Sequence, residues 1–404
     1  MRQGWHRRVR GFQRLGAAWL WCTGALLSVV LTPGALRAYA VHTSLTHGCH
    51  EDISADALTD LLADGHLDTS QVPLPARQHW RGLADEMLPR SGLHLADERE
   101  RFVAFSLLVG SRFPDLQGVA ISHTQSMYIN HADPSDQHEH FLRAPQHDGP
   151  AGDVAAVDVA VRSIEERVAK ALHPNAPIIY VDEYVDFYGA VSVAVWAPAF
   201  YLGHAMHTLQ DSFSHTVRSA DLHRIYHVTN FVDAVSAHYD EARDGMAHSM
   251  RMDDCTDKKN APIVRAATLA SRDFLDALVD PDWRFAAFAD TWLTHEPGCT
   301  MQNDFCDSPW TSLARREPVG PILTTFVDCA IAPGVTGSGA ATSAMPPLLM
   351  AMLVGLGVLG ARRWLRSARS TTGPRHRQPQ QGRCERGALP RFARRVFGAG
   401  ACRR

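Results

Sequence analysis

Apolar residues recur at intervals of three and four along the middle of the chain, from about residue 50 to residue 330. This spacing places apolar side chains on one face of a helix and therefore predicts amphipathic α-helices. The two-residue alternation typical of a strand is suggested at Ile178–Val181 alone. The fold class that we predict is all-α, with a single multi-helix domain over residues 41–330. Its expected helices are Asp52–Leu62, Ala76–Leu88, Ala96–Leu108, Val154–Leu172, Tyr184–Phe213, Asp221–Ser249 and Ala261–Leu278.

A long segment without periodic pattern, Pro114–Pro150, separates two of these helices. It is longer than an ordinary connection inside a compact domain, so we expect it to be functional. Its histidines are His123, His131, His138, His140 and His147. A metal-sequestering role is one interpretation of this loop.

The N-terminal end has a different residue pattern from the predicted domain. Residues 1–40 place five arginines ahead of an apolar run, Leu15–Leu31, and end in the small-residue site Ala38–Ala40. This order is typical of a secretory signal peptide, and we expect cleavage after Ala40. An uncleaved membrane anchor is the alternative.

The C-terminal end has three parts: a linker of small residues at 331–344, an apolar stretch at 345–361 and a basic tail at 362–404. The apolar stretch is at the short limit for spanning a bilayer, and its basic flank would stay on the cytoplasmic side. We therefore expect a C-terminal transmembrane or sorting segment that contacts the membrane, and a tail that is disordered. The predicted location is outside the cytoplasm, at the cell surface, in the outer envelope or secreted, with export and sorting machinery as partners.

Cysteine usage agrees with export, because five cysteines lie between the predicted signal and the apolar stretch. Pairing among Cys255, Cys299 and Cys306 would cross-link a loop-rich region, although spacing does not fix the connectivity. With Cys49 included, the odd number leaves one thiol over, and Cys329 at the start of the linker is the candidate.

Charge and histidine content limit the classes of ligand that the protein is expected to bind. Residues 41–360 hold 21 Lys and Arg against 42 Asp and Glu, so this body should repel nucleic acid and anionic membranes unless cations neutralise it. Of the 22 histidines, 20 fall between His42 and His295. Histidine is the commonest metal ligand among side chains, so the composition favours a metal-binding protein and makes nucleic acid an unlikely partner.

The most informative stretch is Phe200–His215. On a helix, His207, Asp211 and His215 are each four residues apart and therefore share one face, with His204 beside them. Two imidazoles and a carboxylate on one stripe suit a divalent cation such as zinc, which takes His nitrogen and Asp oxygen.

This stretch resembles the central helix of the zinc-dependent phospholipase C and single-strand nuclease superfamily, which reads FYLG, three residues, His, three residues, Asp, and then a further His. Phe200–Gly203, His207 and Asp211 match that pattern, and His215 matches the following histidine. With Gln210, the motif is closest to the heterokaryon-incompatibility C-like branch. The resemblance covers roughly residues 42–240 and implies a helical zinc-dependent phospholipase C-like domain.

Other segments are similar to the remaining ligand positions of that superfamily. His50 resembles its first helical histidine, Gly110–Asp115 its Gly-x-x-x-Pro-Asp segment, and His140 the histidine that closes the next loop. His223 and His227 resemble its last ligand pair, for which His238 with Glu241 is the alternative. The ligand set that the resemblance implies is His50, Asp115, His140, His207, Asp211, His215, His223 and His227.

The resemblance also implies two or three Zn²⁺ ions, with Asp211 as the bridge. Zinc lowers the pKa of bound water towards 7 and clamps phosphoryl oxygens during in-line attack, while Asp115 would be the catalytic residue that orients or deprotonates the water. The implied function is hydrolysis of a phosphodiester, with phospholipid favoured over nucleic acid. Alternatives are single-strand nuclease-like activity and a non-catalytic structural or interaction protein on the same scaffold.

Overall fold

The computed structural model describes residues 48–316, except for 66, 77–78, 118–132, 186–188 and 237. The predicted signal peptide, linker, apolar stretch and tail, together with Cys329, His123 and His131, lie outside the described residues. Among the helices of the described ranges, none combines the length and the apolar character needed to cross a membrane.

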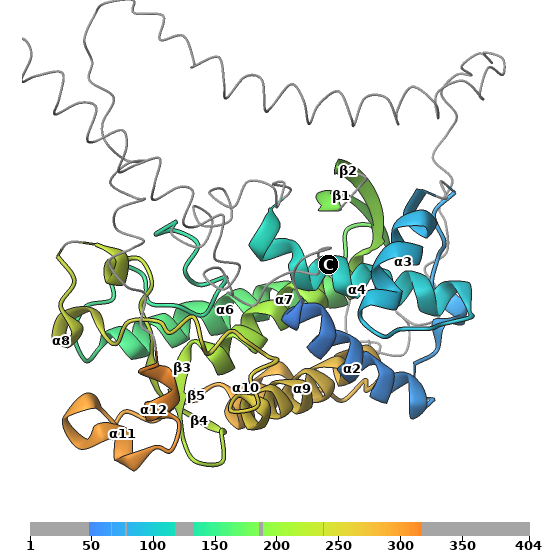
Figure 1. Ribbon diagram of the computed structural model, residues 1–404. Coiled ribbons are helices and arrows are strands. Elements are labelled where there is room, and N and C mark those ends of the chain that lie inside the picture. Colours follow the sequence, from blue (N-terminus) through green and yellow to red (C-terminus); the bar gives the residue numbers. More distant parts are fainter. Residues whose placement is uncertain are drawn as a thin grey trace, which may run out of the picture. The chain divides into compact units, whose positions relative to one another are not determined.

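The described part of the chain is mostly helical and is built around helix α7 (Ala197–Ser214). This helix packs against α4 (Glu98–Leu116), α6 (Gly152–Leu172) and α9 (Ala261–Leu275), as Figure 1 shows. Helix α2 (Cys49–Ala63) lies against α9 and α4. Because α7 has neighbours on several sides, 15 of its 18 residues are buried, and its apolar residues are spread around the helix.

Two glycines allow α4 and α7 to approach closely. A Cβ atom on Gly110 would lie 2.1 Å from the carbonyl oxygen of Phe200, and one on Gly203 would lie 2.1 Å from that of Leu107. Any larger side chain at either position would push the two helices apart. This crossing matters for the site, because α4 and α7 both carry its residues.

The predicted helix Tyr184–Phe213 is wrong in its first part. An antiparallel hairpin of β1 (Ile178–Val185) and β2 (Gly189–Trp196) occupies this region and includes the alternation at Ile178–Val181. Gly189 has a φ of +78°, which a glycine tolerates at the turn, and valines at alternate positions favour a strand over a helix. Pro198 in the first turn of α7 is typical of a helix start, and the helix begins there.

The predicted helix Asp221–Ser249 is also wrong. Strand β4 (Arg224–Val228) runs through it, antiparallel to β3 (Thr216–Arg218) and parallel to β5 (Thr294–His295). The backbone of Asn230 then forms bridges to Arg143 and Ala247, and Gly245 adopts a φ of +86°. Long-range backbone hydrogen bonds therefore override the helical periodicity. In place of the predicted all-α fold, the described residues form a mostly helical fold with two small sheets.

The remaining helix predictions agree with the structure within a few residues, except that α4 continues eight residues past the predicted end at Leu108 and so takes up Pro114 and Asp115. The shorter elements are η1 (Thr69–Gln71), α3 (His79–Arg90), η2 (Asp233–Val235), α8 (Glu241–Asp244), η3 (Asp276–Leu278), α10 (Phe285–Trp292), η4 (Met301–Asn303), α11 (Asp304–Asp307) and α12 (Thr311–Ala314).

Two disulfides cross-link the part of the chain that the structure describes. Cys299 pairs with Cys306, which is one of the pairings that the sequence left open, but Cys255 pairs with Cys49, 206 residues away. The second bond joins the start of α2 to the segment that precedes α9. Disulfides persist in oxidising compartments, so both bonds are consistent with a location outside the cytoplasm.

Candidate metal centre

Asp211 is the centre of a buried group of histidines. Its Oδ1 atom lies 3.3 Å from His50 Nε2 and 3.8 Å from His215 Nε2, while its Oδ2 atom lies 3.2 Å from His207 Nε2 and 3.3 Å from His140 Nδ1. All five residues are at most 3 % exposed. The two oxygens of one carboxylate therefore face two different pairs of imidazoles.

Helix α7 supplies His207 and Asp211 from consecutive turns, and His215 caps its C-terminal end. His50 comes from the first turn of α2, and Asp115 comes from the last turn of α4. Asp115 Oδ1 lies 3.8 Å from His207 Nε2 and 3.9 Å from His140 Nδ1. The structure thus brings together six of the eight ligands that the resemblance implies.

A further buried group, formed by His215, His248 and Asp253, contains two residues that sequence analysis missed. His215 Nε2 lies 3.2 Å from Asp253 Oδ1, and His248 Nε2 lies 2.7 Å from Asp253 Oδ2. His248 and Asp253 are 3 % and 1 % exposed and belong to a segment without a long helix or strand. The one local signal was Cys255, two residues after Asp253, because its disulfide partner Cys49 directly precedes His50.

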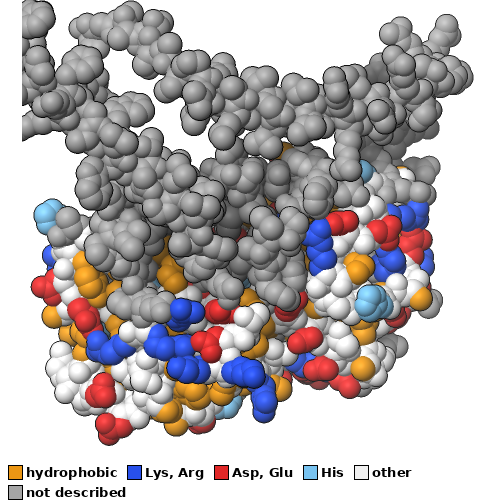
Figure 2. Space-filling model, in the orientation of Figure 1, with side chains coloured by type: hydrophobic (Ala, Val, Ile, Leu, Met, Phe, Trp, Pro, Cys, Tyr) orange, Lys and Arg blue, Asp and Glu red, His pale blue; other side chains and the backbone are white. Residues whose placement is uncertain are grey.

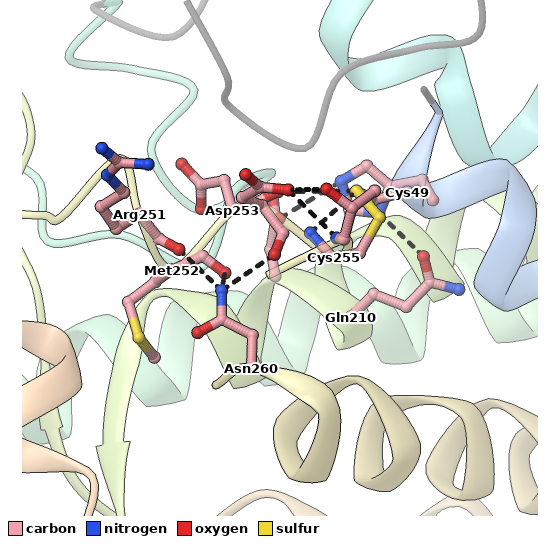
Figure 3. Close-up of a disulfide and its surroundings, with 11 residues drawn as sticks. Cys49, Gln210, Arg251, Met252, Asp253, Cys255 and Asn260 are labelled. Atoms are coloured by element: carbon pink, nitrogen blue, oxygen red, sulfur yellow. Dashed lines mark hydrogen bonds and ion pairs between the residues drawn. A yellow bond between two sulfur atoms is a disulfide. The ribbon is translucent and has the colours of Figure 1, made fainter. Parts of the chain in front are cut away.

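Figure 3 shows how that disulfide holds the segment in place. The side-chain amide of Asn260 donates to the backbone carbonyls of Arg251, Met252 and Asp254 at distances of 2.6, 3.3 and 3.0 Å. Together with the Cys49–Cys255 bond, these contacts fix the chain on both sides of Asp253 and direct its carboxylate towards His215 and His248.

In three of these histidines, the ring nitrogen that does not face Asp211 already donates a hydrogen bond. His207 Nδ1–H donates to the carbonyl of Ser111 at 2.8 Å, His50 Nδ1–H donates to Gln210 Oε1 at 2.7 Å, and His215 Nδ1–H donates to the carbonyl of His140. In the neutral rings, each Nε2 lone pair then points at a carboxylate oxygen, which is repulsive unless a proton or a metal ion lies between them. Metal-ligating histidines commonly have this arrangement, with an oxygen acceptor on the outer nitrogen.

Protons fill this role when no metal is bound. Burial lowers the pKa of His50 and of His215, but the facing carboxylates, led by Asp211 and joined at His215 by Asp253, together outweigh it and raise both pKa values to about 9. Burial alone would raise the pKa of Asp211, yet the facing charges of His215, His207 and His50 hold that pKa well below its usual range. A carboxylate amid basic imidazoles is a donor set that a divalent cation can occupy by displacing protons.

Several predicted or neighbouring residues lie outside these groups. His223 is half-buried, with its ring stacked on Trp292 at 4.5 Å. His227 lies on β4, where its Nδ1–H donates to Asp153 at 3.0 Å and its Nε2 accepts the amide of Met246 at 2.8 Å, so both nitrogens serve the packing of the sheet. Glu241 pairs with Arg315 at 2.9 Å. His223 and His227 are four residues apart, but this interval does not bring them to one face, because the chain there is extended and not helical.

His204 belongs to a neighbouring ion cluster and not to the three groups. Its Nε2 lies 2.9 Å from Glu139 Oε2, and Glu139 also pairs with Arg167. Burial lowers the pKa of His204 to about 4, so this ring is neutral at ordinary pH. Glu139 directly precedes His140 in sequence, so its ion pairs help to anchor the loop that carries His140.

Three buried groups of histidine and aspartate could hold metal ions within the described residues: His50, His207 and Asp211; Asp115, His140 and His207; and His215, His248 and Asp253. In each group the candidate ligand atoms lie within 4.8 Å of one another. The nitrogen and carboxylate donors fit zinc better than calcium or magnesium, which prefer oxygen donors alone. Comparison with known proteins gives no further identification, because no family model, curated protein or solved structure matches this chain.

Proposed function

We propose that this protein is an exported, zinc-dependent phosphodiester hydrolase of the phospholipase C-like kind. The observation that carries the proposal is the position of Asp211, whose two carboxylate oxygens each face a separate pair of histidine nitrogens at 3.2–3.8 Å. A carboxylate in this position suits a bridge between two cations. Sites with two metal ions are common in enzymes that cleave phosphate esters.

The residues that would hold two or three zinc ions are those of the three groups, in which His248 and Asp253 take the places first expected for His223 and His227. Zinc bound there would supply Lewis-acid chemistry, lowering the pKa of water and balancing the charge of a phosphodiester. Asp115 is the candidate general base, because its carboxylate borders this group at 3.8 and 3.9 Å from two ligand nitrogens. A positioned base that takes a proton from the attacking water contributes on the order of 10²- to 10⁴-fold to the rate.

Phospholipid is the substrate class that we favour over nucleic acid. The segment 41–360 has twice as many acidic as basic residues, so it cannot neutralise many phosphates of a polynucleotide. On the face shown in Figure 2, basic and acidic side chains are interspersed over the described part. A single phosphodiester needs only the local positive charge of the metal centre, and the C-terminal apolar stretch would keep the enzyme at a membrane.

The test is hydrolysis of a chromogenic phosphodiester and of phosphatidylcholine vesicles by the purified protein, before and after chelation and zinc restoration. We expect two or three tightly bound zinc ions per chain, activity that is lost with the chelator, and activity that returns with zinc. Asp211→Asn should lose both zinc and activity, because an amide supplies neither charge nor two equivalent oxygens. The matched control is Asp282→Asn, since the side chain of Asp282 is 94 % exposed and far from any cluster in sequence.

Each remaining outcome points to a different function. Tight zinc without turnover would identify a non-catalytic structural or interaction protein on the same helical scaffold. Weak binding with variable stoichiometry would identify metal sequestration. Cleavage of single-stranded nucleic acid but not of vesicles would replace the lipid substrate by a nuclease substrate, and full activity in Asp211→Asn would refute the site.

A further inference from the structure

Gln210 is completely buried between three helices and contacts the first ligand histidine. It lies on α7 directly before Asp211, and its side chain reaches His50 on α2. Its Oε1 atom accepts the Nδ1–H of His50 at 2.7 Å. Its Nε2 atom donates to the hydroxyl of Ser54 on α2 at 3.0 Å and to that of Ser271 on α9 at 3.2 Å.

These contacts are compatible with one orientation of the amide when His50 binds a cation. The amide nitrogen of a glutamine has two hydrogens and no acceptor capacity, and here each hydrogen has a hydroxyl oxygen to receive it. Turning the amide over would place a nitrogen donor against Nδ1 of His50, and the ring would then have to carry its proton on Nε2, the atom that faces Asp211. In the structure the oxygen of Gln210 faces His50.

This oxygen decides which nitrogen of His50 keeps its proton when a cation occupies the site. A ring that donates through Nδ1 has its lone pair on Nε2, the atom that lies 3.3 Å from Asp211 Oδ1. This tautomer is the one in which His50 can bind a cation beside Asp211. The opposite tautomer would place a proton there and could not ligate through Nε2.

His50 differs in this respect from its two neighbours. His207 and His215 are oriented by backbone carbonyls, those of Ser111 and His140, which no substitution removes. His50 alone of the three depends on a side chain. Its orientation can therefore be removed or conserved by changing one residue.

We propose that Gln210 is a positioning residue that makes His50 a metal ligand, by holding the ring in the tautomer whose Nε2 faces Asp211. The inference rests on the proposed metal centre. It assigns Gln210 a role through hydrogen-bond acceptance at one atom, Oε1, and not through the volume that its side chain fills.

Two substitutions of similar shape separate these roles. Gln210→Met fills the space without an acceptor, whereas Gln210→Glu keeps an oxygen for His50 and can accept from the hydroxyls of Ser54 and Ser271. The zinc affinity of the full protein is measured by competition with a chromophoric chelator, and the number of retained ions by elemental analysis. In Gln210→Met we expect a zinc affinity about 10- to 100-fold weaker and the loss of one ion, as for other residues that hydrogen-bond to metal ligands. In Gln210→Glu we expect a zinc affinity within a few-fold of the wild type.

Thermal unfolding in excess chelator gives the folding control, since both variants should retain a cooperative transition. Equal zinc affinities in the wild type and Gln210→Met, with zinc tight in both, would overturn the inference and leave the metal centre intact. Equal losses in Gln210→Met and Gln210→Glu would also overturn it, because packing and not acceptance would then explain the effect. A wild type without tight zinc would refute the metal centre and the role of Gln210 together.

Discussion

The Cys49–Cys255 disulfide should stabilise the metal-free protein more than the Cys299–Cys306 disulfide does. It closes a loop with a sequence separation of 206 residues, and the chain-entropy relation gives a stabilisation of about 5 kcal/mol for a loop of that length. The Cys299–Cys306 bond closes a separation of 7 residues, for which the same relation gives about 2 kcal/mol. The double variant Cys49→Ser/Cys255→Ser should therefore lose about 3 kcal/mol more than Cys299→Ser/Cys306→Ser.

Zinc binding should separate the two variants further. Cys49 directly precedes His50, and Cys255 follows Asp253 by two residues, so loss of this bond frees a ligand-bearing segment at each end. No residue between Cys299 and Cys306 belongs to a metal group among the described residues, and removal of that bond should leave zinc affinity unchanged. The matched pair distinguishes a general loss of stability from a specific effect on the site.

The assay is urea unfolding in excess chelator, followed by far-ultraviolet circular dichroism, with zinc affinity measured separately under native conditions. The free energy of unfolding is compared at equal slope, since a changed slope would indicate an altered denatured state. Equal destabilisation of the two variants, or equal zinc affinities, would refute the reasoning. The first result would show that loop length does not control stability here, and the second that the Cys49–Cys255 bond does not hold the site.

Three further predictions concern pH, helix packing and the third group. The pKa values of His50 and His215 are raised to about 9 in the folded protein. Their stabilising contribution to the metal-free protein is therefore complete below pH 6.5 and is lost as the pH rises from 6.5 to 9. Equal urea midpoints at pH 6 and pH 9, measured in chelator, would contradict this prediction. Zinc affinity should change in the opposite direction, rising towards pH 9 as protons cease to compete. Gly203→Ala should cost about 1–3 kcal/mol by forcing α4 from α7, whereas Gly298→Ala, whose nearest neighbour would be a flexible side-chain atom at 3.8 Å, should be neutral in the same unfolding assay. Asp253→Asn should lose one zinc ion by elemental analysis, and an unchanged ion count would exclude Asp253 as a ligand.

Local spacing was sufficient for the part of the site that lies on α7. His207 and Asp211 are four residues apart on α7, and this interval alone predicts that their side chains share a face. The same rule failed at His223 and His227, because it applies only where the chain is helical. Backbone pairing of β4 with β3 and β5 made that segment extended. Pairing with a strand distant in sequence does not produce a periodic pattern of apolar residues in the local sequence.

The sequence by itself therefore determined the helical body, the stripe on α7 and the abundance of histidine around it. Tertiary structure decided which histidines meet, since His248 and Asp253 reach the group through the Cys49–Cys255 bond and the contacts of Asn260, neither of which follows from local pattern. It also decided the tautomer of His50, because Gln210 binds it across the boundary between α7 and α2. The physical reason is the same in each case: periodicity records which face of an element is apolar, whereas ligand geometry depends on contacts between elements far apart in the chain.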